Sequence, residues 1–349
     1  MASFTPEKKF IRILSIDGGG VRGIIPGQIL AKLEHKLQAR TGDPEKRLAD
    51  YFDFFAGTGT GGILSCAYIT PLKEKIRTPR FSASQIVDFY IRYAGAIFDN
   101  TFDHKLITLG GLLDEQYSAV GMEKMFADYF ETIQLSQLLK PCVITSYDIH
   151  RRRGHFFTQH TASRPSSDFY VRDIARATSA IPTYFECKEI ASLSGVSYPL
   201  VDGSIVAYNP ALCAVAEVSK VFYGSQARTQ QATLPAMLIL SLGTGLPKMQ
   251  YSYEDAKDWG LAKWARPLQR MTASANAEAV DYQLQQLYTS IGARQQYLRI
   301  NPELPIDVAA EIDNVQPQNL QALKELGDTT FEAMELELDK FVSLMLEEE

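Results

Sequence analysis

The chain has 349 residues, of which 46% are apolar, and a formal net charge of -6 at pH 7. These values are typical of an ordered globular protein with a large core, and the acidic balance argues against a nucleic-acid polymer as a partner. The four cysteines are scattered and form no C-x-x-C pair, which favours a reduced, cytoplasmic protein over one built on disulfides.

Membrane-spanning segments are not expected. No apolar run approaches the roughly 18–20 residues that a span requires, and residues 1–9 lack the apolar centre of a signal peptide. Docking on a bilayer and spanning it are separate properties, so a peripheral position at the inner membrane surface stays open.

The first predicted elements are a strand, a glycine turn and a helix. Residues 10–16 are apolar and β-rich, and they end at Asp17 and a run of glycines. A helix with apolar residues at i, i+4 and i+8 follows and is expected to stop near residue 42. Residues 51–56 form the next predicted strand, before a helix of small and apolar residues that runs to about residue 71.

Later segments continue this alternation. Further buried strands are predicted at 141–149, 198–201 and 234–242, and helices at 82–98, 122–130, 171–180, 211–219, 268–288, 319–326 and 331–346. Residues 100–121 are irregular and form a candidate active-site loop or lid. The alternation predicts an α/β fold with a mostly parallel central sheet flanked by helices. We expect residues 10–245 to form the core and residues 246–349 a C-terminal helical part packed on the same domain.

Special turns are predicted at one rim of this sheet. Glycine turns follow the strands that end at Ile16, Phe55 and Leu242, and Asp202 directly follows another strand. Ligands of parallel α/β sheets bind beyond the carboxyl ends of the strands. We therefore expect these turns to surround a ligand site.

Residues 56–62, Ala-Gly-Thr-Gly-Thr-Gly-Gly, have the layout of a nucleophile elbow, in which a strand turns sharply into a helix. The usual motif is G-x-S-x-G. Gly57 and Gly61 take the outer glycine positions, and Gly59 stands at the centre in place of serine. A helix that begins at Thr60 adds N–H groups and a favourable dipole for an anion.

The glycine loop at residues 17–23, Asp-Gly-Gly-Gly-Val-Arg-Gly, is suited to bind an oxyanion, because glycines let successive N–H groups face a ligand. A dinucleotide-binding fingerprint and a purely structural turn are alternatives, although no strand ending in an acidic residue follows about 20 residues later. The candidate oxyanion-hole residues are Gly18, Gly19, Gly20, Arg22 and Thr60.

A carboxylate is the best candidate for the catalytic base. Hydrolase triads of this plan place the histidine after the acid, but all five histidines precede Asp202. Asp202 ends an apolar strand and is followed by Gly203; the alternative is an aspartate that only shapes an Asx turn. The i+5 spacing of His150, His155 and His160 does not suit a metal site, so we expect no metal.

Together these motifs resemble the patatin-like phospholipase family of lipid acyl hydrolases. The loop at 17–23 resembles the family's oxyanion motif, the segment 56–62 its elbow with Gly59 in place of Ser, and Val201-Asp202-Gly203-Ser204 its Asp-Gly-Gly/Ala motif. The segments 144–149, 175–185, 209–210 and 240–245 also resemble family segments, in the family's order.

The likeness covers about residues 10–245. It implies an α/β fold, a Ser–Asp dyad with Asp202 as base, cleavage of phospholipid or other lipid esters at a membrane surface, and no cofactor. Length and a compact layout are also similar to bacterial patatin-like effectors of antiviral signalling, which implies a cyclic-nucleotide activator. No oligomeric state is predicted.

Gly59 leaves three interpretations open. The chain is an inactivated form of an active enzyme, a natural variant kept as a lipid or cyclic-nucleotide sensor, or a variant that hydrolyses by another route, such as water activated by Asp202. A non-glycine residue at the centre of an elbow is strained by about 1–3 kcal/mol. Glycine at this position therefore keeps the fold while it removes the hydroxyl of the usual serine.

Overall fold

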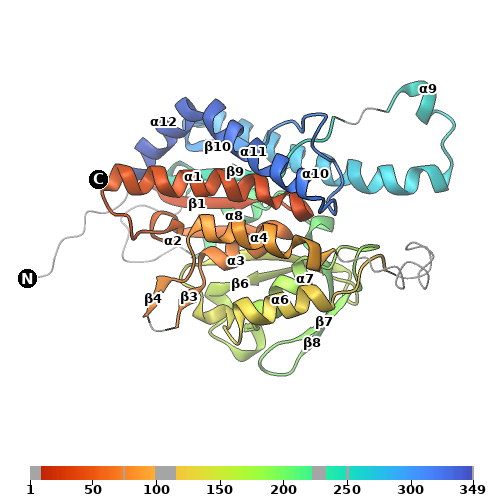
Figure 1. The fold of residues 1–349 in the computed structure, drawn as a ribbon. Coiled ribbons are helices and arrows are strands. Elements are labelled where there is room, and N and C mark those ends of the chain that lie inside the picture. Colours follow the sequence, from red (N-terminus) through yellow and green to blue (C-terminus); the bar gives the residue numbers. More distant parts are fainter. Residues whose placement is uncertain (1–8, 74, 99–114, 222–232, 249–250, 348–349) are drawn as a thin grey trace, which may run out of the picture.

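The centre of the structure is an eight-stranded sheet with the strand order β10-β9-β1-β2-β5-β8-β7, and β6 pairs with β5 outside this path (Figure 1). This computed structural model describes residues 9–73, 75–98, 115–221, 233–248 and 251–347. The strands of the sheet are β1 (Ile11–Ile16), β2 (Phe54–Gly57), β5 (Cys142–Asp148), β6 (Arg153–Thr158), β7 (Lys188–Ala191), β8 (Ser197–Asp202), β9 (Met237–Leu242) and β10 (Tyr297–Ile300). A separate hairpin pairs β3 (Pro71–Leu72) with β4 (Lys75–Pro79).

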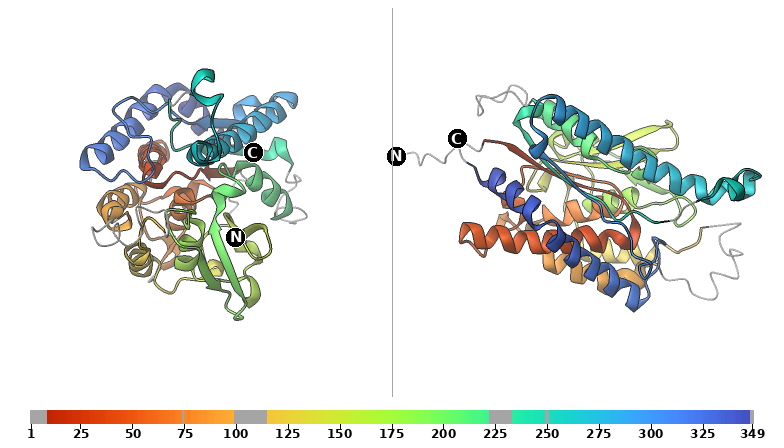
Figure 2. Two further views of the ribbon diagram at one scale, coloured as in Figure 1. Left: turned by 90° about the vertical axis from the view of Figure 1, so that its right-hand side faces the viewer. Right: turned by 90° about the horizontal axis from the view of Figure 1, so that it is seen from above.

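Helices cover both faces of the sheet (Figures 1 and 2). The α-helices are α1 (Ile24–Thr41), α2 (Leu48–Tyr51), α3 (Thr60–Tyr68), α4 (Ala83–Ile97), α6 (Val120–Phe130), α7 (Val171–Thr178), α8 (Ala211–Val221), α9 (Tyr253–Ala256), α10 (Leu261–Ser290), α11 (Pro317–Ala333) and α12 (Glu335–Leu346). The 3-10 turns are η1 (Gly20–Gly23), η2 (Leu135–Gln137), η3 (Gln159–Thr161), η4 (Pro165–Ser167), η5 (Gly203–Ile205), η6 (Leu234–Ala236) and η7 (Arg294–Gln296). None of these described helices is both long enough and apolar enough to cross a membrane.

Strand β1 shows why the sheet is buried on both faces. All its residues are buried, and they alternate between two cores as the period of a strand requires. Leu14 and Ile16 belong to the cluster that contains α1, α4 and α6, whereas Ile11 and Ile13 belong to the cluster of α8 and α10. This layered arrangement confirms the predicted α/β class.

Strand direction changes across the sheet. The pairs from β10 through β9, β1 and β2 to β5 are parallel, while β6 and β8 run antiparallel to β5 and β7 runs antiparallel to β8. Asp202 does lie at the rim, but not for the expected reason, since its strand is antiparallel to β5. Instead β5 continues past the level of Gly57, and β8 runs back along this extension until Asp202 is level with Ser146.

The chain after residue 245 contributes more than helices. Its strand β10 extends the sheet beside β9, and α11 packs along α1, where the amide of Gln28 donates to Asp328 at 2.8 Å. Both parts of the chain share one sheet. The division at residue 245 stays a prediction. Most of the predicted lid, at residues 99–114, lies outside the described residues, and Gly121 belongs to α6.

Candidate active site

The elbow predicted around Gly59 joins β2 to α3. Gly59 has φ 54° and ψ -122°, a conformation that favours glycine and that reverses the chain between strand and helix. The two outer glycines of the elbow allow the backbones around them to approach closely. A Cβ on Gly57 would lie 2.2 Å from the oxygen of Gly61, and one on Gly61 would lie 2.1 Å from the oxygen of Ile16. Only glycine fits at these two positions.

Gly59 differs from its neighbours because a Cβ there would not collide with the backbone. A Cβ at residue 59 would lie 3.7 Å from the nearest atoms of Gly18 and Thr178, which is ordinary contact. Its closest neighbour would be Oδ2 of Asp202 at 3.1 Å. A side chain at this position would thus point at the carboxylate of Asp202.

Asp202 is buried, and its two oxygens have different surroundings. Oδ1 accepts a hydrogen bond from the backbone N–H of Ser204 at 2.6 Å, which is the Asx turn that formed the alternative interpretation. Oδ2 faces the Cβ position of residue 59. Burial raises the pKa of Asp202 to about 6, although the hydrogen bonds from Ser204 act against the shift. The turn therefore orients a carboxylate suited to accept a proton near neutral pH.

Three backbone N–H groups are available at the same place. Among the hydrogen bonds of the described residues, none uses the N–H of Gly19, Gly20 or Thr60 as donor. All three residues line one pocket together with Asp202. N–H groups held in this way, beside a possible nucleophile position, form an arrangement that can bind an oxyanion.

Two predicted oxyanion residues do not have a free N–H group. The N–H of Gly18 donates to the backbone carbonyl oxygen of Tyr208 at 3.2 Å, and the N–H of Arg22 donates to the backbone carbonyl oxygen of Gly19 at 3.3 Å. The buried side chain of Arg22 reaches the hydroxyl of Tyr208 with one nitrogen, and Arg22 does not line the pocket. We therefore leave Gly18 and Arg22 out of the candidate oxyanion hole.

Apart from Ser179, the rest of the pocket is apolar. It contains about 490 Å³ of empty space, the solvent at its mouth included, and lies against α4 and α6. Thr60 is held there by Tyr90, whose hydroxyl lies 2.5 Å from its Oγ1. The apolar residues of the lining were not predicted from the sequence, although the apolar face of the predicted helix 82–98 was a signal for several of them. The apolar lining consists of Val21, Ile63, Tyr90, Ala94, Ile97, Phe98, Met122, Phe126, Ile181 and Phe185.

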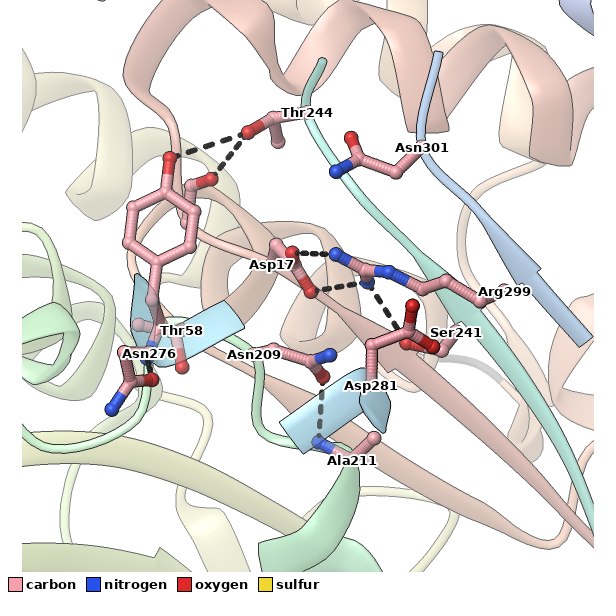
Figure 3. A network of polar contacts seen from close by, with 12 residues as sticks. Asp17, Thr58, Asn209, Ala211, Ser241, Thr244, Asn276, Asp281, Arg299 and Asn301 are labelled. Atoms are coloured by element: carbon pink, nitrogen blue, oxygen red, sulfur yellow. Dashed lines mark hydrogen bonds and ion pairs between the residues drawn. The ribbon is translucent and has the colours of Figure 1, made fainter. Parts of the chain in front are cut away.

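A buried ion pair fixes the start of the glycine loop (Figure 3). The Arg299 guanidinium of β10 donates to both carboxylate oxygens of Asp17, at 2.8 and 2.5 Å, and also to Oγ of Ser241. Burial alone lowers the pKa of Arg299, but the charge of Asp17 outweighs it and raises the pKa. Burial also raises the pKa of the Asp17 carboxyl, and the guanidinium of Arg299 acts against that shift. Asp17 stands two residues before Gly19, the first candidate oxyanion residue. Arg299 is not among the site residues predicted from the sequence.

The described residues show no metal centre. They contain no group of three or more His, Cys, Asp or Glu side chains that could hold a metal ion. His155 packs against aromatic rings of Phe157, Phe169 and Tyr198, and His160 lies 3.1 Å from Glu217, so these histidines occupy different surroundings.

The elbow, the facing carboxylate and the adjacent N–H groups define the class of an α/β ester hydrolase. Comparison with known proteins agrees: a family model described as patatin-like phospholipase matches residues 14–215. The chain belongs to the patatin-like phospholipase family.

Several plant proteins are similar over almost the whole chain. Patatin-like protein 2 of Arabidopsis thaliana is 34% identical over 91% of this chain and 82% of its own length. "Probable inactive patatin-3-Kuras 1" of Solanum tuberosum is 30% identical over 99% of this chain and 95% of its own length. The solved structure of VipD from Legionella pneumophila covers 93% of this chain and 68% of its own, but its 10% identity and TM-score of 0.35 are too low to support a conclusion.

The burial of Asp202 leads to a first prediction. We expect Asp202→Asn to raise the free energy of unfolding at pH 8 by about 3 kcal/mol, from a pKa of about 6 in the folded chain against 3.8. Because the folded pKa is the higher one, the charged carboxylate destabilises the fold as pH rises from about 4 to about 6. The gain should therefore shrink to about half near pH 5, as chemical denaturation at both pH values would show.

Asp148→Asn is a control with the opposite sign. Burial alone would raise the pKa of Asp148, but hydrogen bonds from the backbone and guanidinium of Arg151 lower it. Its charge therefore stabilises the fold at pH 8, and the asparagine variant should lose stability there. An Asp202→Asn form that is less stable than the parent at pH 8 would contradict a raised pKa at Asp202.

Proposed function

We propose that this pocket is a lipid acyl-hydrolase site of the phospholipase A type, built for a Ser–Asp dyad, and that Gly59 leaves the chain inactive or impaired. One observation carries the proposal: a Cβ at residue 59 would face Oδ2 of Asp202 at 3.1 Å, beside the N–H groups of the pocket. The apolar walls suit an acyl chain, and the family membership supports a lipid ester as substrate.

The mechanism follows from this geometry. A serine hydroxyl at residue 59 would give its proton to Asp202 while its oxygen attacks the ester carbonyl. The N–H groups of Gly19, Gly20 and Thr60 would stabilise the oxyanion of the tetrahedral intermediate. When this intermediate collapses, Asp202 returns the proton to the leaving alcohol and an acyl-enzyme remains. Water, deprotonated by Asp202, then attacks the acyl-enzyme, and Asp202 returns this proton to the serine oxygen as the fatty acid leaves.

Gly59 favours a second candidate function. Without the hydroxyl, the chain keeps a lined pocket and N–H groups that can bind a lipid ester without covalent chemistry. One relative of similar length carries the name "probable inactive" patatin, which supports an inactive scaffold as an alternative here. Attack by water activated by Asp202 is the third route. Lipid binding without hydrolysis by the unmodified chain would select the scaffold, and slow hydrolysis that is lost in Asp202→Asn would select the water route.

Regulation by a cyclic nucleotide belongs to the narrower part of the proposal. It rests on the similarity of length and layout to bacterial antiviral effectors, whereas the similar proteins reported above are plant proteins. Titration with cyclic dinucleotides, with the oligomeric state as readout, tests it directly. A cytoplasmic site of action at a membrane surface is part of the same proposal, and the scattered cysteines support it.

The pH dependence of a serine form tests the role of Asp202. We expect kcat/KM of the Gly59→Ser form on a soluble ester to rise with pH through about 6, because only the ionised carboxylate accepts the proton of the hydroxyl. The profile should be level above pH 7. A rate that stays constant from pH 4.5 to pH 8 would remove Asp202 from the role of base.

A further inference from the structure

Residues 251–276 form an arm that consists of α9 and the first half of α10. In two perpendicular views this arm extends beyond the body of the molecule (Figures 1 and 2). No side chain described within 251–276 is buried, and Ala277 is the first buried residue of α10. The described side chains of the arm thus form no core of their own.

The arm carries large apolar side chains in a regular pattern. Leu261, Trp264, Leu268 and Met271 follow each other at i, i+3, i+7 and i+10, which places them on one face of the helix. Leu261 is 91% exposed and Leu268 56%. Such a large exposed apolar surface marks an interaction site rather than an ordinary solvated helix.

Aromatic rings gather where the arm begins. Trp259 lies between Tyr251 and Trp264, with ring centroids 5.1 Å from each, and Tyr253 is 78% exposed. Trp259 and Trp264 are the two tryptophans of the chain. Tryptophan and tyrosine concentrate at the boundary between water and lipid, where an apolar ring and a polar group are both satisfied.

The part of the arm that belongs to α10 is basic, which favours an anionic surface as its partner. Residues 259–277 contain Lys263, Arg266 and Arg270 and no Asp or Glu, in a chain whose net charge is -6. The acidic residues of the arm lie before residue 259, around α9. A helix with leucine and tryptophan on one face and basic residues elsewhere is typical of segments that lie in the headgroup region of anionic bilayers.

We propose that the α9–α10 arm docks on the surface of an anionic phospholipid bilayer and holds the pocket at the lipid. The proposal rests on the proposed lipid function and names the element that brings the enzyme to its substrate. The arm extends at the same end of the molecule as the pocket-lining ends of α4 and α6, at the right in Figure 1.

The two tryptophans provide a direct measurement. The unmodified chain is titrated with vesicles of phosphatidylglycerol and phosphatidylcholine, and its tryptophan emission is expected to shift to shorter wavelength and to be quenched by brominated lipids. Vesicles of phosphatidylcholine alone should bind more weakly, and added salt should weaken the binding to anionic vesicles. Unchanged emission at saturating anionic lipid would overturn the proposal.

Charged substitutions locate the contact. We expect the double variant Leu261→Glu/Leu268→Glu to lower vesicle binding about tenfold or more, and Lys263→Glu to lower binding to anionic vesicles about fivefold or more. Tyr282→Glu is the matched control, because Tyr282 is 66% exposed on the same helix but outside the arm, and its binding should equal that of the parent. An equal loss in the control would contradict docking through the arm.

A second copy of the chain is the competing occupant. Sedimentation of the lipid-free protein tests it: dimers that disappear in the Leu261→Glu/Leu268→Glu variant would assign this face to self-association and overturn the bilayer assignment. Hydrolysis of a soluble ester by the Gly59→Ser form separates the two proposals. Activity without vesicle binding defeats the arm alone, and vesicle binding by an inactive serine form defeats the hydrolase alone.

Discussion

Replacing Gly59 with serine is expected to raise hydrolysis of a soluble ester by at least about a thousandfold over the unmodified chain. Removal of a nucleophile of this kind typically lowers turnover by on the order of a millionfold, while oxyanion groups and binding retain a small part of the catalysis. In this chain the carboxylate faces residue 59 and the N–H groups line the pocket, so the hydroxyl is the part that the site lacks. Initial rates on a 4-nitrophenyl ester and on phospholipid vesicles measure the gain.

Gly59→Ala separates the chemistry from the strain. With φ at 54°, any side chain at residue 59 is strained by about 1–3 kcal/mol, and its Cβ would press on Asp202 at 3.1 Å. Serine and alanine should therefore lower the free energy of unfolding by similar amounts, while only serine confers hydrolysis. A folded serine form that is no faster than the alanine form on any lipid ester would refute the proposed dyad.

The dyad also requires Asp202. In the Gly59→Ser background, Asp202→Asn should lower kcat by about ten-thousandfold or more, since asparagine keeps the shape and the turn but cannot accept the proton. Because the single Asp202→Asn change is expected to stabilise the fold at pH 8, lost activity could not be attributed to unfolding. Full activity in the double variant would assign the base to another group.

The strand-to-helix turn at Gly59 is accessible to sequence reasoning, because its requirements are local. Gly57 and Gly61 are needed where the strand and helix backbones approach, and such glycines stand in the sequence beside the strand that they end. The position of Asp202 was predicted for an incorrect reason, since β8 is antiparallel. Nothing near Asp202 in the sequence indicates that β5 extends past the level of Gly57. The sequence also does not indicate that β8 runs back along this extension and brings Asp202 to residue 59.

Other parts of the site depend on contacts between distant segments. Arg299 is 282 residues from Asp17 in the sequence, and it belongs to a short strand in a part predicted as helical. Four residues with mixed polarity, β10, give too weak a pattern to predict a strand, and pairing with β9 supplies the stability that the local sequence lacks. Similarly, which of Gly18, Gly19 and Gly20 has a free N–H group depends on the distant residue Tyr208. Its backbone carbonyl oxygen accepts the hydrogen bond from Gly18.

Arg299→Met is expected to lower the free energy of unfolding by about 3–5 kcal/mol. The side chains of Asp17 and Arg299 are 1% and 8% exposed, so the substitution leaves a buried carboxylate without its countercharge. A second change, Asp17→Asn, removes that charge and should restore most of the lost stability. Denaturation in urea at pH 7 for the two single variants and the double variant gives the coupling energy.

An exposed ion pair is the control for this cycle. Lys9 and Glu347 lie 2.8 Å apart with side chains 47% and 42% exposed, and Lys9→Met should change stability by less than about 1 kcal/mol. If Arg299→Met cost no more than Lys9→Met, the pair would not hold the glycine loop. In the Gly59→Ser background the Arg299 variant should also lower kcat at temperatures where it is still folded, because Asp17 lies two residues before Gly19, whose N–H is proposed to bind the oxyanion. The double variant, which keeps the fold without the ion pair, then shows whether the rate depends on stability alone or on the position of that loop.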